Sequence, residues 1–425
     1  MVSSMESKAH LAYRHRARSC VGVANLSVKK SLSLTDGSVS CALMQLAFPI
    51  LCANVLQSLN NTVSAFWVGR YFGEAALTAV ANAQSMMILL TGAAFGITMA
   101  ASIMIGQCMG VHDIAGAKRV VSTGLSFFVV LSVGLTMLGF VFVEPSLVAI
   151  RTPSEALPLA VPYTRIMLLA LPSMYIFAFL MSLLLGFGDA MTPLKFVCLS
   201  VVLGAGLTPA FMFWGGGILG TGVVGAALAT FAVQSLCLVA LVGHLYRRRH
   251  PLCLTKHDAE TFRVDWFIVR ELVRKGIPMG AQVLVISLSS VLVIALVNRF
   301  GVDTTAAYAA LVQVWAYILM PALAIAVAVS TMTAQNVGAQ NWTRIKRTAH
   351  VGVGYSVAVT GVIVVFVYAA DSYAYRLFLP PGSEAIDIAR HVSGVVTWSL
   401  VFMSIPVVLF GVMRAAGAVM VPLLV

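Results

Sequence analysis

Long apolar runs of about 20 residues or more alternate with short polar and basic segments along almost the whole chain. A helix needs about 20 apolar residues to cross the hydrocarbon of a bilayer, whereas the strands of a membrane barrel show short alternating segments. The pattern therefore predicts an all-α, polytopic membrane protein. The ten predicted spans are Ala42–Val68, Leu77–Met104, Val121–Val143, Leu157–Leu185, Pro193–Trp214, Gly222–Leu245, Gly276–Val297, Thr305–Met332, Ala349–Ala369 and Val392–Val412.

The chain also contains an internal repeat. GQCMGVHDIAGAKR, which begins at Gly106, can be laid over AQNVGAQNWTRIKR, which begins at Ala334, and Gln, Gly, Lys and Arg then recur in register. SLNNTVSAFWVGR matches SLSSVLVIALVNR, and GDAMTP matches GAVMVP, at almost the same separation along the chain. Six spans fit into this length, so both copies enter the membrane from the same side. We expect two pseudo-symmetric six-helix bundles, related by an axis along the membrane normal, with a transport path between them.

The repeated basic segment is predicted to be a connector between spans. Gly110 and Gly338 are expected to let the backbone turn, and Gln107 and Gln335 to bond carbonyl groups at the interface. The Lys-Arg pair that follows is expected to anchor the next helix at the anionic leaflet. GDAMTP is predicted to be a helix-ending turn, because no strand precedes it and it lacks the Lys-Ser/Thr partner of a phosphate loop.

The repeat length also sets the domain boundaries. We expect a basic cytoplasmic tail over 1–40, an N-terminal six-helix lobe over 41–246, a cytoplasmic linker over 247–275 and a C-terminal lobe with four helices over 276–425. The first lobe runs through two more spans after its GDAMTP turn, so we expect the last two helices of the second lobe to be missing, as in a truncated product. The linker is also predicted to contain an interfacial helix, because four of its apolar residues would share one helical face: Phe262, Trp266, Val269 and Val273.

Composition and charge support a membrane protein and reduce the number of possible functions. Only 10% of the residues are charged and 60% are apolar, whereas soluble proteins average about 25% charged residues. The net charge of +12 could suggest a nucleic-acid partner. Instead, 21 of the 27 Lys and Arg residues fall on the predicted cytoplasmic side if the amino terminus is cytoplasmic. This positive-inside bias explains the charge and predicts a multi-pass membrane protein with a cytoplasmic amino terminus, bound to lipid and not to nucleic acid.

The sequence offers no pattern for catalysis or for a resident cofactor. The seven cysteines are scattered and form no CxxC or Cys/His set, so we expect free thiols. No Ser/His/Asp, HExxH or paired-carboxylate arrangement stands in a plausible place. We therefore predict that the protein is not an enzyme and binds no cofactor or metal.

Polar side chains on the spans are the candidate contacts for a transported substrate. Four of them recur on the first span at steps of three, four and three, so that they share one helical face: Asn54, Gln57, Asn61 and Ser64, with Asn60 beside them. An amide in hydrocarbon needs partners and so faces the bundle interior. Further candidates from other spans are Asn82, Gln84, Tyr175, Gln282, Gln313 and Tyr317. The alternative for any one of them is that it only joins neighbouring helices.

Several of these segments, taken in order, resemble one family. LQSLNNTVSAFWVGRYFGEAALTAVANA, LLLGFGDAMTPL, GTGVVGAALAT, RKGIPMGAQ and AQNVGAQN are similar to segments of the MATE multidrug and toxic compound extrusion transporters, in the branch like DNA-damage-inducible protein F or NorM. The resemblance implies twelve helices in two lobes, alternating access, and export of amphipathic compounds driven by inward H⁺ or Na⁺ flow. It also implies that Gln57 contacts substrate and that the protein lies in the bacterial inner membrane.

The chain departs from the family at the acidic positions. Members commonly carry carboxylates where this chain has Ser64, Thr208, Ile286 and Met403. We include Thr208 among the substrate-path candidates. No acid or histidine lies in the middle of a predicted span, although an acid kept there at a cost of about 2.5–3.5 kcal/mol usually marks an ion path. The ligands of the coupling ion are therefore not predicted.

The leading interpretation is a monomeric secondary exporter of amphipathic small molecules. One alternative is a degenerate, non-transporting paralogue or a fragment, which the absent carboxylates and the expected missing helices both favour. Another is a lipid-linked-sugar flippase, which would need a cationic cavity for pyrophosphate; the spans offer no Arg or Lys at mid-depth.

Overall fold

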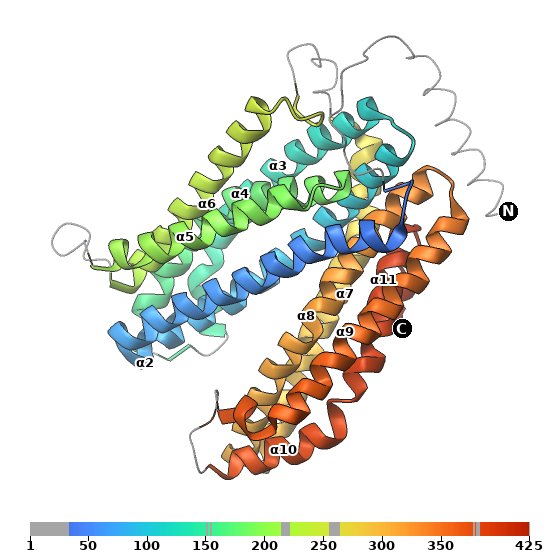
Figure 1. Cartoon of the computed structure of the whole chain (residues 1–425). Coiled ribbons are helices and arrows are strands. Elements are labelled where there is room, and N and C mark those ends of the chain that lie inside the picture. The colour runs from blue at the N-terminus through green and yellow to red at the C-terminus, as the bar shows by residue number, and fades with distance from the viewer. Residues whose placement is uncertain are drawn as a thin grey trace. The chain divides into compact units, whose positions relative to one another are not determined.

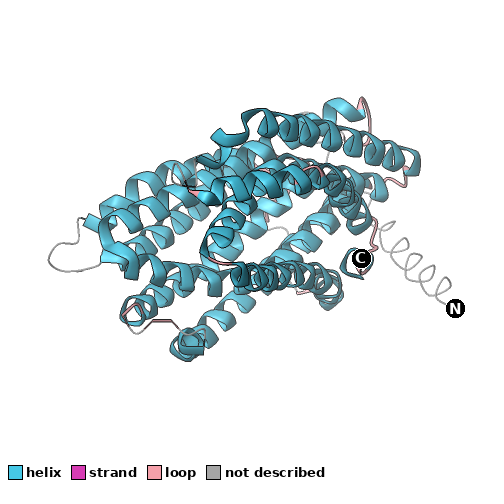
Figure 2. Ribbon diagram, turned by 90° about the horizontal axis from the view of Figure 1, so that it is seen from below, coloured by secondary structure: helices cyan, strands magenta, loops and turns pink. Residues whose placement is uncertain are grey.

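The computed structural model describes residues 34–149, 152–153, 155–213, 222–254, 264–376, 379 and 383–424, and Leu34–Val425 form one compact unit. The described residues are helical, with turns between the helices and no strand (Figures 1 and 2). The helices are α2 (Val39–Gly110), α3 (Ile114–Ala149), α4 (Leu157–Phe187), α5 (Met191–Phe213), α6 (Gly222–Arg247), α7 (Trp266–Val297), η3 (Asn298–Phe300), α8 (Val302–Gly338), α9 (Trp342–Arg376), α10 (Glu384–Val396), α11 (Ser399–Ala415) and α12 (Val421–Leu424).

The helix α2 contains two spans. Its 72 residues would reach about 108 Å if they formed a straight helix. Both of its ends nevertheless lie against the same end of α8, because Asn336 bonds the carbonyl of Leu34 just before α2, and Gly110 at its end abuts the Gln335 carbonyl. The chain therefore doubles back between the spans Val39–Asn60 and Thr78–Gly110.

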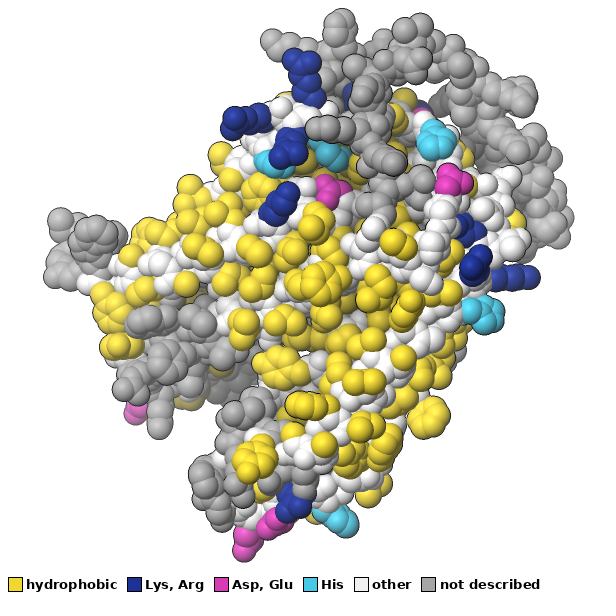
Figure 3. All heavy atoms as spheres, in the orientation of Figure 1, with side chains coloured by type: hydrophobic (Ala, Val, Ile, Leu, Met, Phe, Trp, Pro, Cys, Tyr) yellow, Lys and Arg dark blue, Asp and Glu magenta, His cyan; other side chains and the backbone are white. Residues whose placement is uncertain are grey.

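The predicted spans correspond to the helices of the structure. Among the described residues, nine helices are long and apolar enough to cross a membrane, and the bent pair α10 and α11 makes a tenth if it forms one span. The two members of that pair meet at 57°. The sequence predicted one span over Val392–Val412 here, and the break falls inside it, at Thr397 and Trp398. Hydrophobic side chains cover much of the visible surface, with charged ones gathered toward the helix ends (Figure 3).

The first helix of each repeat packs against the other repeat. Leu43 and Leu46, near the start of α2, share a buried cluster with Val329 and Met332 of α8. Leu272, near the start of α7, belongs to the cluster formed mainly by α2, α3 and α4. We call residues 34–254 the first half and residues 264–424 the second half. Each half therefore contributes the beginning of its first helix to a core of the other half.

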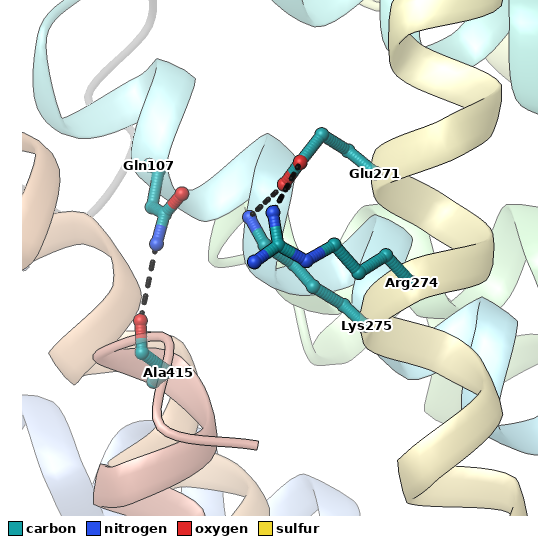
Figure 4. Close-up of polar contacts among 5 residues, drawn as sticks. All are labelled: Gln107, Glu271, Arg274, Lys275 and Ala415. Atoms are coloured by element: carbon teal, nitrogen blue, oxygen red, sulfur yellow. Dashed lines mark hydrogen bonds and ion pairs between the residues drawn. The ribbon is translucent and has the colours of Figure 1, made fainter. Parts of the chain in front are cut away.

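The described part of the predicted interfacial helix is the start of α7. Asp265 caps this helix by accepting from the backbone N–H of Phe267, and the helix then continues without a break from Trp266 to Val297. Phe262 lies outside the described residues. On the next turns Glu271 pairs with Lys275 at 3.2 Å and more loosely with Arg274 at 3.8 Å (Figure 4).

Candidate functional site: a seam between the repeats

The two repeated connectors have the same backbone geometry. His112 and Gln340, which are equivalent in the repeat, both adopt a φ of 58° and end their helices. One residue later, Asp113 accepts from the backbone N–H of Gly116, and Asn341 accepts from that of Arg344, so each caps the following helix. We expected the glycines to make these turns, and that expectation is wrong, because the left-handed residues are His112 and Gln340.

Gly110 and Gly338 instead let the two halves approach each other closely. A Cβ atom at Gly110 would overlap the carbonyl oxygen of Gln335, and a Cβ at Gly338 would overlap that of Gln107. The two contacts are reciprocal: each repeat places its glycine against the glutamine carbonyl of the other. Only glycine allows a backbone to come this near.

The side chains of the same two glutamines cross between the halves. Nε2 of Gln107 donates to the carbonyl oxygen of Ala415 at 3.1 Å (Figure 4), and Nε2 of Gln335 donates to that of Gly186, also at 3.1 Å. Ala415 lies at the end of α11, and Gly186 lies at the equivalent place of the first repeat, at the end of α4. Both glutamines therefore bond carbonyl groups, as expected, but the carbonyls belong to the other half, whereas the sequence interpretation placed them at the membrane interface.

These contacts form one surface, which we call the basic-end seam. Gly106 and Ala334, which are equivalent in the repeat, meet across it, since a Cβ at Gly106 would lie 2.8 Å from Cβ of Ala334. A self-paired position flanked by reciprocal contacts is the pattern that a two-fold axis produces. The seam consists of Gly106, Gln107, Gly110, Gly186, Ala334, Gln335, Gly338 and Ala415.

The segment before α2 closes the same end of the molecule. The guanidinium of Arg344 donates three hydrogen bonds, to the carbonyl oxygens of Leu34, Asp36 and Gly37, at 3.0, 2.8 and 2.8 Å. The amide of Asn336 donates to the same Leu34 carbonyl at 3.2 Å. Leu34 is fully buried. The turn ahead of the first span is therefore fixed to the second half. Sequence reasoning did not find this role of Arg344, whose equivalent in the first half is Gly116.

Apolar side chains fill the seam just beyond the glutamines. Ile103, Met279, Ala334 and Ala415 form a small buried cluster there. Arg414 lies beside it, donating to the Phe410 carbonyl at 3.1 Å and reaching Sδ of Met99 at 3.5 Å. The seam is thus closed by backbone approach, amide hydrogen bonds and apolar packing, without a carboxylate contact in the described residues.

The polar face predicted on the first span is only partly described. Asn54 is half-buried and Gln57 is exposed. The oxygen of Asn60 lies 3.0 Å from a Cβ placed on Gly204, so this side chain faces α5 of its own half. The side chains of Asn61 and Ser64 lie outside the described part of the chain.

The other candidates are dispersed over several contacts. Tyr175 is buried and donates to the Leu90 carbonyl at 2.6 Å, and Asn82 donates to Thr152 at 3.3 Å, so both join elements of the first half. Gln282 donates to the Pro422 carbonyl at 2.7 Å. Thr208 is buried, while three side chains are exposed: Gln84, Gln313 and Tyr317. The hydrogen bonds described for these candidates join them to other residues, not to one another.

A polar network that the sequence did not suggest surrounds the break between α10 and α11. Tyr375 donates to Ser393 at 2.6 Å, Ser393 and Thr397 share a bond of 2.9 Å, and Trp315 donates to Thr397 at 3.1 Å. Tyr368 donates to the Ser393 carbonyl at 2.7 Å. These hydroxyl groups form hydrogen bonds with one another and with a backbone carbonyl where the helix bends. No group of three or more metal-ligating His, Cys, Asp or Glu side chains occurs in the described ranges.

Comparisons with known proteins agree with the repeat. The MatE family model matches residues 49–210 and again 278–425, and the starts of the two matches are one repeat length apart. The probable multidrug resistance protein YoeA of Bacillus subtilis is 32% identical over 88% of this chain and 81% of its own length. YpnP of the same organism is 27% identical over 92% and 86%. An outward-facing multidrug resistance MATE transporter of the MOP superfamily superposes with a TM-score of 0.86 at 21% identity, covering 94% of this chain and 87% of that one.

Proposed function

This chain belongs to the MATE family of membrane transporters, and we propose that it exports amphipathic small molecules in exchange for inward-moving H⁺ or Na⁺. The substrate class is supported by the relatives, which are named as probable multidrug resistance proteins. We place the chain in the membrane as a monomer with the lobe boundaries expected from the repeat, and with its basic end toward the cytoplasm.

The observation that carries this proposal is the reciprocal contact at the basic-end seam. Two lobes related by a pseudo-two-fold axis can rock about a path between them, opening it to one side at a time. In the present state the seam joins the lobes at the basic end. Export then requires the reciprocal contacts to separate so that a substrate can enter from that side, and to form again when the path opens to the other side.

The strength of the seam suits a reversible gate. Interhelical hydrogen bonds in membranes average about 0.6 kcal/mol, so the two glutamine bonds together contribute about 1.2 kcal/mol. One cation that crosses a potential of about 100 mV releases about 2.3 kcal/mol. A single coupling ion can therefore offset the loss of both bonds. A gate held by a buried ion pair would be harder to open, because separating the partners leaves an uncompensated charge.

We propose that the substrate path is lined by the polar side chains selected from the sequence. On the first span these are Asn54, Gln57 and Asn60, together with Asn61 and Ser64. Tyr175 and Asn82 are weaker candidates, because each already bonds a neighbour within the first half. The coupling ion has no mid-span carboxylate available in this sequence. We infer that neutral oxygens of hydroxyls and carbonyls hold it.

Transport by purified protein in vesicles tests the function. Proton and sodium gradients are imposed separately, and uptake of an amphipathic cationic dye is followed. We expect one of the two gradients to drive uptake. A seam-locking variant, Gly106→Cys with Ala334→Cys in a background without the seven native cysteines, should lose transport on oxidation and regain it on reduction. A Cβ at Gly106 lies 2.8 Å from that of Ala334, so the two backbones must move apart until the Cβ atoms reach the roughly 3.5–4.5 Å of a disulfide. Each single-cysteine variant serves as its control.

Two outcomes would contradict the proposal in different ways. If the cross-link forms quantitatively and transport continues, the seam does not gate the path. If folded protein moves no compound of a broad amphiphile panel under either gradient, the non-transporting alternative is favoured. Uptake of a lipid-linked sugar in place of the dyes would support the flippase alternative.

A further inference from the structure

A groove away from the seam lies on the first half, between α3, α4 and α6. Its cavity has a volume of about 220 Å³. Helix α4 packs against both α3 and α6 and forms the base of the groove. The lining is almost entirely apolar: Val121, Leu125, Ile176, Leu180, Leu183, Leu184, Leu238, Val242, Leu245, Tyr246, Leu252, Cys253 and Leu254.

The loop after α6 closes the basic end of this groove. Leu252 is buried in the core that includes Val121. The hydroxyl of Tyr246 donates to the Leu254 carbonyl at 3.1 Å, and the N–H of Leu252 donates to Nδ1 of His250 at 3.3 Å. Burial lowers the pKa of His250, which keeps this nitrogen available as an acceptor. The loop is therefore a fixed wall of the groove.

Basic side chains stand where the groove meets this loop. Lys118, Val121 and Leu125 follow one another at steps of three and four, so the lysine continues the face of α3 that lines the groove. Burial raises the pKa of the thiol of Cys253, another lining residue, and the positive charge of Lys118 acts in the opposite direction. The exposed Arg247, Arg248 and Arg249 come directly after Tyr246. Figure 3 shows Lys and Arg side chains gathered at the end of the molecule where α6 ends.

We propose that this groove binds an anionic phospholipid of the adjoining leaflet, with part of an acyl chain among the leucines and the headgroup at Lys118 and Arg247–Arg249. The dry, apolar interior suits hydrocarbon, and the cations at one end suit a phosphate. The volume lies below the roughly 300 Å³ at which pockets for drug-sized ligands begin, so part of one acyl chain fits and a bulky substrate does not.

A second cavity provides an internal comparison. It lies between α9 and α11 of the second half, has a volume of about 540 Å³, and is lined by apolar side chains that include Val362 and Trp398. No charged residue lines either cavity directly, but the chain segments beside this one, 354–368 and 396–405, carry no Lys or Arg. Hydrocarbon can enter both cavities, but only the groove on the first half combines an apolar interior with cations at its end. Of the two cavities, only the groove should therefore select for a headgroup.

Native mass spectrometry of the purified full chain tests this proposal. Phosphatidylglycerol and phosphatidylcholine with identical acyl chains are added in turn, and bound lipid is counted. We expect at least tenfold tighter retention of phosphatidylglycerol. Leu125→Trp, which fills the groove, should abolish this preference. Lys118→Gln and Arg248→Gln should each weaken it about fivefold, since each basic residue near a lipid surface contributes about that factor. Val362→Trp, in the comparison cavity, should leave it unchanged.

A fluorescence measurement keeps the proposal testable if Leu125→Trp does not fold. Tyr246→Trp places a reporter in the groove, and its emission is compared with that of the six native tryptophans in the unmodified chain. Phosphatidylglycerol with brominated chains should quench the added signal more strongly than brominated phosphatidylcholine. Equal quenching by the two lipids would overturn the proposal, as would a headgroup preference that survives in folded Leu125→Trp protein.

Discussion

The two halves of the molecule are alike at the seam and different in their interiors. Phe128 and Tyr175 pack at a ring separation of 6.2 Å inside the first half. Their repeat equivalents in the second half are Ser356 and Ser404, and the hydroxyl of Ser356 lies 3.4 Å from the Ser404 carbonyl. The same pair of positions is in contact in both halves. Two aromatic rings in one half are thus replaced by two serines in the other.

The difference extends to helix continuity and to unpaired groups. Helix α4 runs unbroken through Pro172, whereas its counterpart is divided into α10 and α11 around a hydroxyl network. Thr360, one turn beyond Ser356, is fully buried, and its hydroxyl has no hydrogen-bond partner in the described residues. A buried hydroxyl without a partner is costly in an apolar interior. The glutamines and glycines that make the reciprocal contacts, Gln107 with Gln335 and Gly110 with Gly338, are therefore the same in both repeats, while the compared residues inside the two halves differ in chemistry.

A large effect on stability is expected from substitution of the glycines of the seam. Gly110→Ala and Gly338→Ala should each destabilise the protein by about 3 kcal/mol or more, because the added methyl meets backbone that cannot rotate away. The measurement is unfolding by SDS titration in mixed micelles. Gly134→Ala and Gly354→Ala are the controls on the equivalent helices α3 and α9, where a Cβ meets nothing within 4 Å. A mild effect at either seam glycine would end the claim of close reciprocal approach.

The interiors should respond unequally to truncation. Phe128→Ala removes a fully buried ring that packs on Phe179 at 4.8 Å, and we expect a loss of about 3–5 kcal/mol. Ser356→Ala at the equivalent position should cost less than about 1 kcal/mol, since it removes one long hydrogen bond and little volume. The same unfolding titration compares them. Similar losses at both positions would mean that the interiors are equivalent after all.

The ends of α4 and α11 offer a smaller test. Gly188 and Gly417 are equivalent and adopt φ values of 97° and 96°. Only in the first half is the glycine followed by a residue whose side chain can cap the next helix. Asp189 accepts from the backbone N–H groups of Met191 and Thr192, both at 3.0 Å. Asp189→Ala should cost about 1 kcal/mol, and Ala418→Asp should stabilise the start of α12 by a comparable amount. If both variants shift the unfolding midpoint in the same direction, the equivalence of the two turns is lost.

The spans and the repeat were predictable because each rests on a strong signal. Apolar runs long enough to cross a bilayer leave little choice of structure, and several identical residues at a constant separation define the repeat. The break between α10 and α11 was not predictable, since no glycine or proline marks Thr397. The left-handed turns were assigned to Gly110 and Gly338 because glycine is the usual residue there, whereas His112 and Gln340 adopt that conformation.

The candidate site was harder to predict than the fold. Tyr175 and Asn82 look like path-lining groups in sequence, but their partners lie within their own half, and periodicity alone cannot distinguish the two roles. Bonding of Gln107 and Gln335 to carbonyl groups was predicted, but not that these carbonyls belong to the other half. Their partners, Ala415 and Gly186, contribute only a backbone carbonyl. Every residue type has such a carbonyl, so the sequence does not identify these partners.

The smallest effect should come from the two seam glutamines, and it is the most specific test of their equivalence. Gln107→Leu and Gln335→Leu each remove one hydrogen bond to a carbonyl of the other half, so each should cost about 0.6 kcal/mol. Gln234→Leu is the matched control, because the side-chain oxygen of Gln234 is buried without a partner in the described residues and its removal should not destabilise the protein. The two bonds have the same length and equivalent acceptors, so the two losses should agree with each other. If only one of the two substitutions lowers the stability, the contacts at the seam are reciprocal in geometry but unequal in free energy.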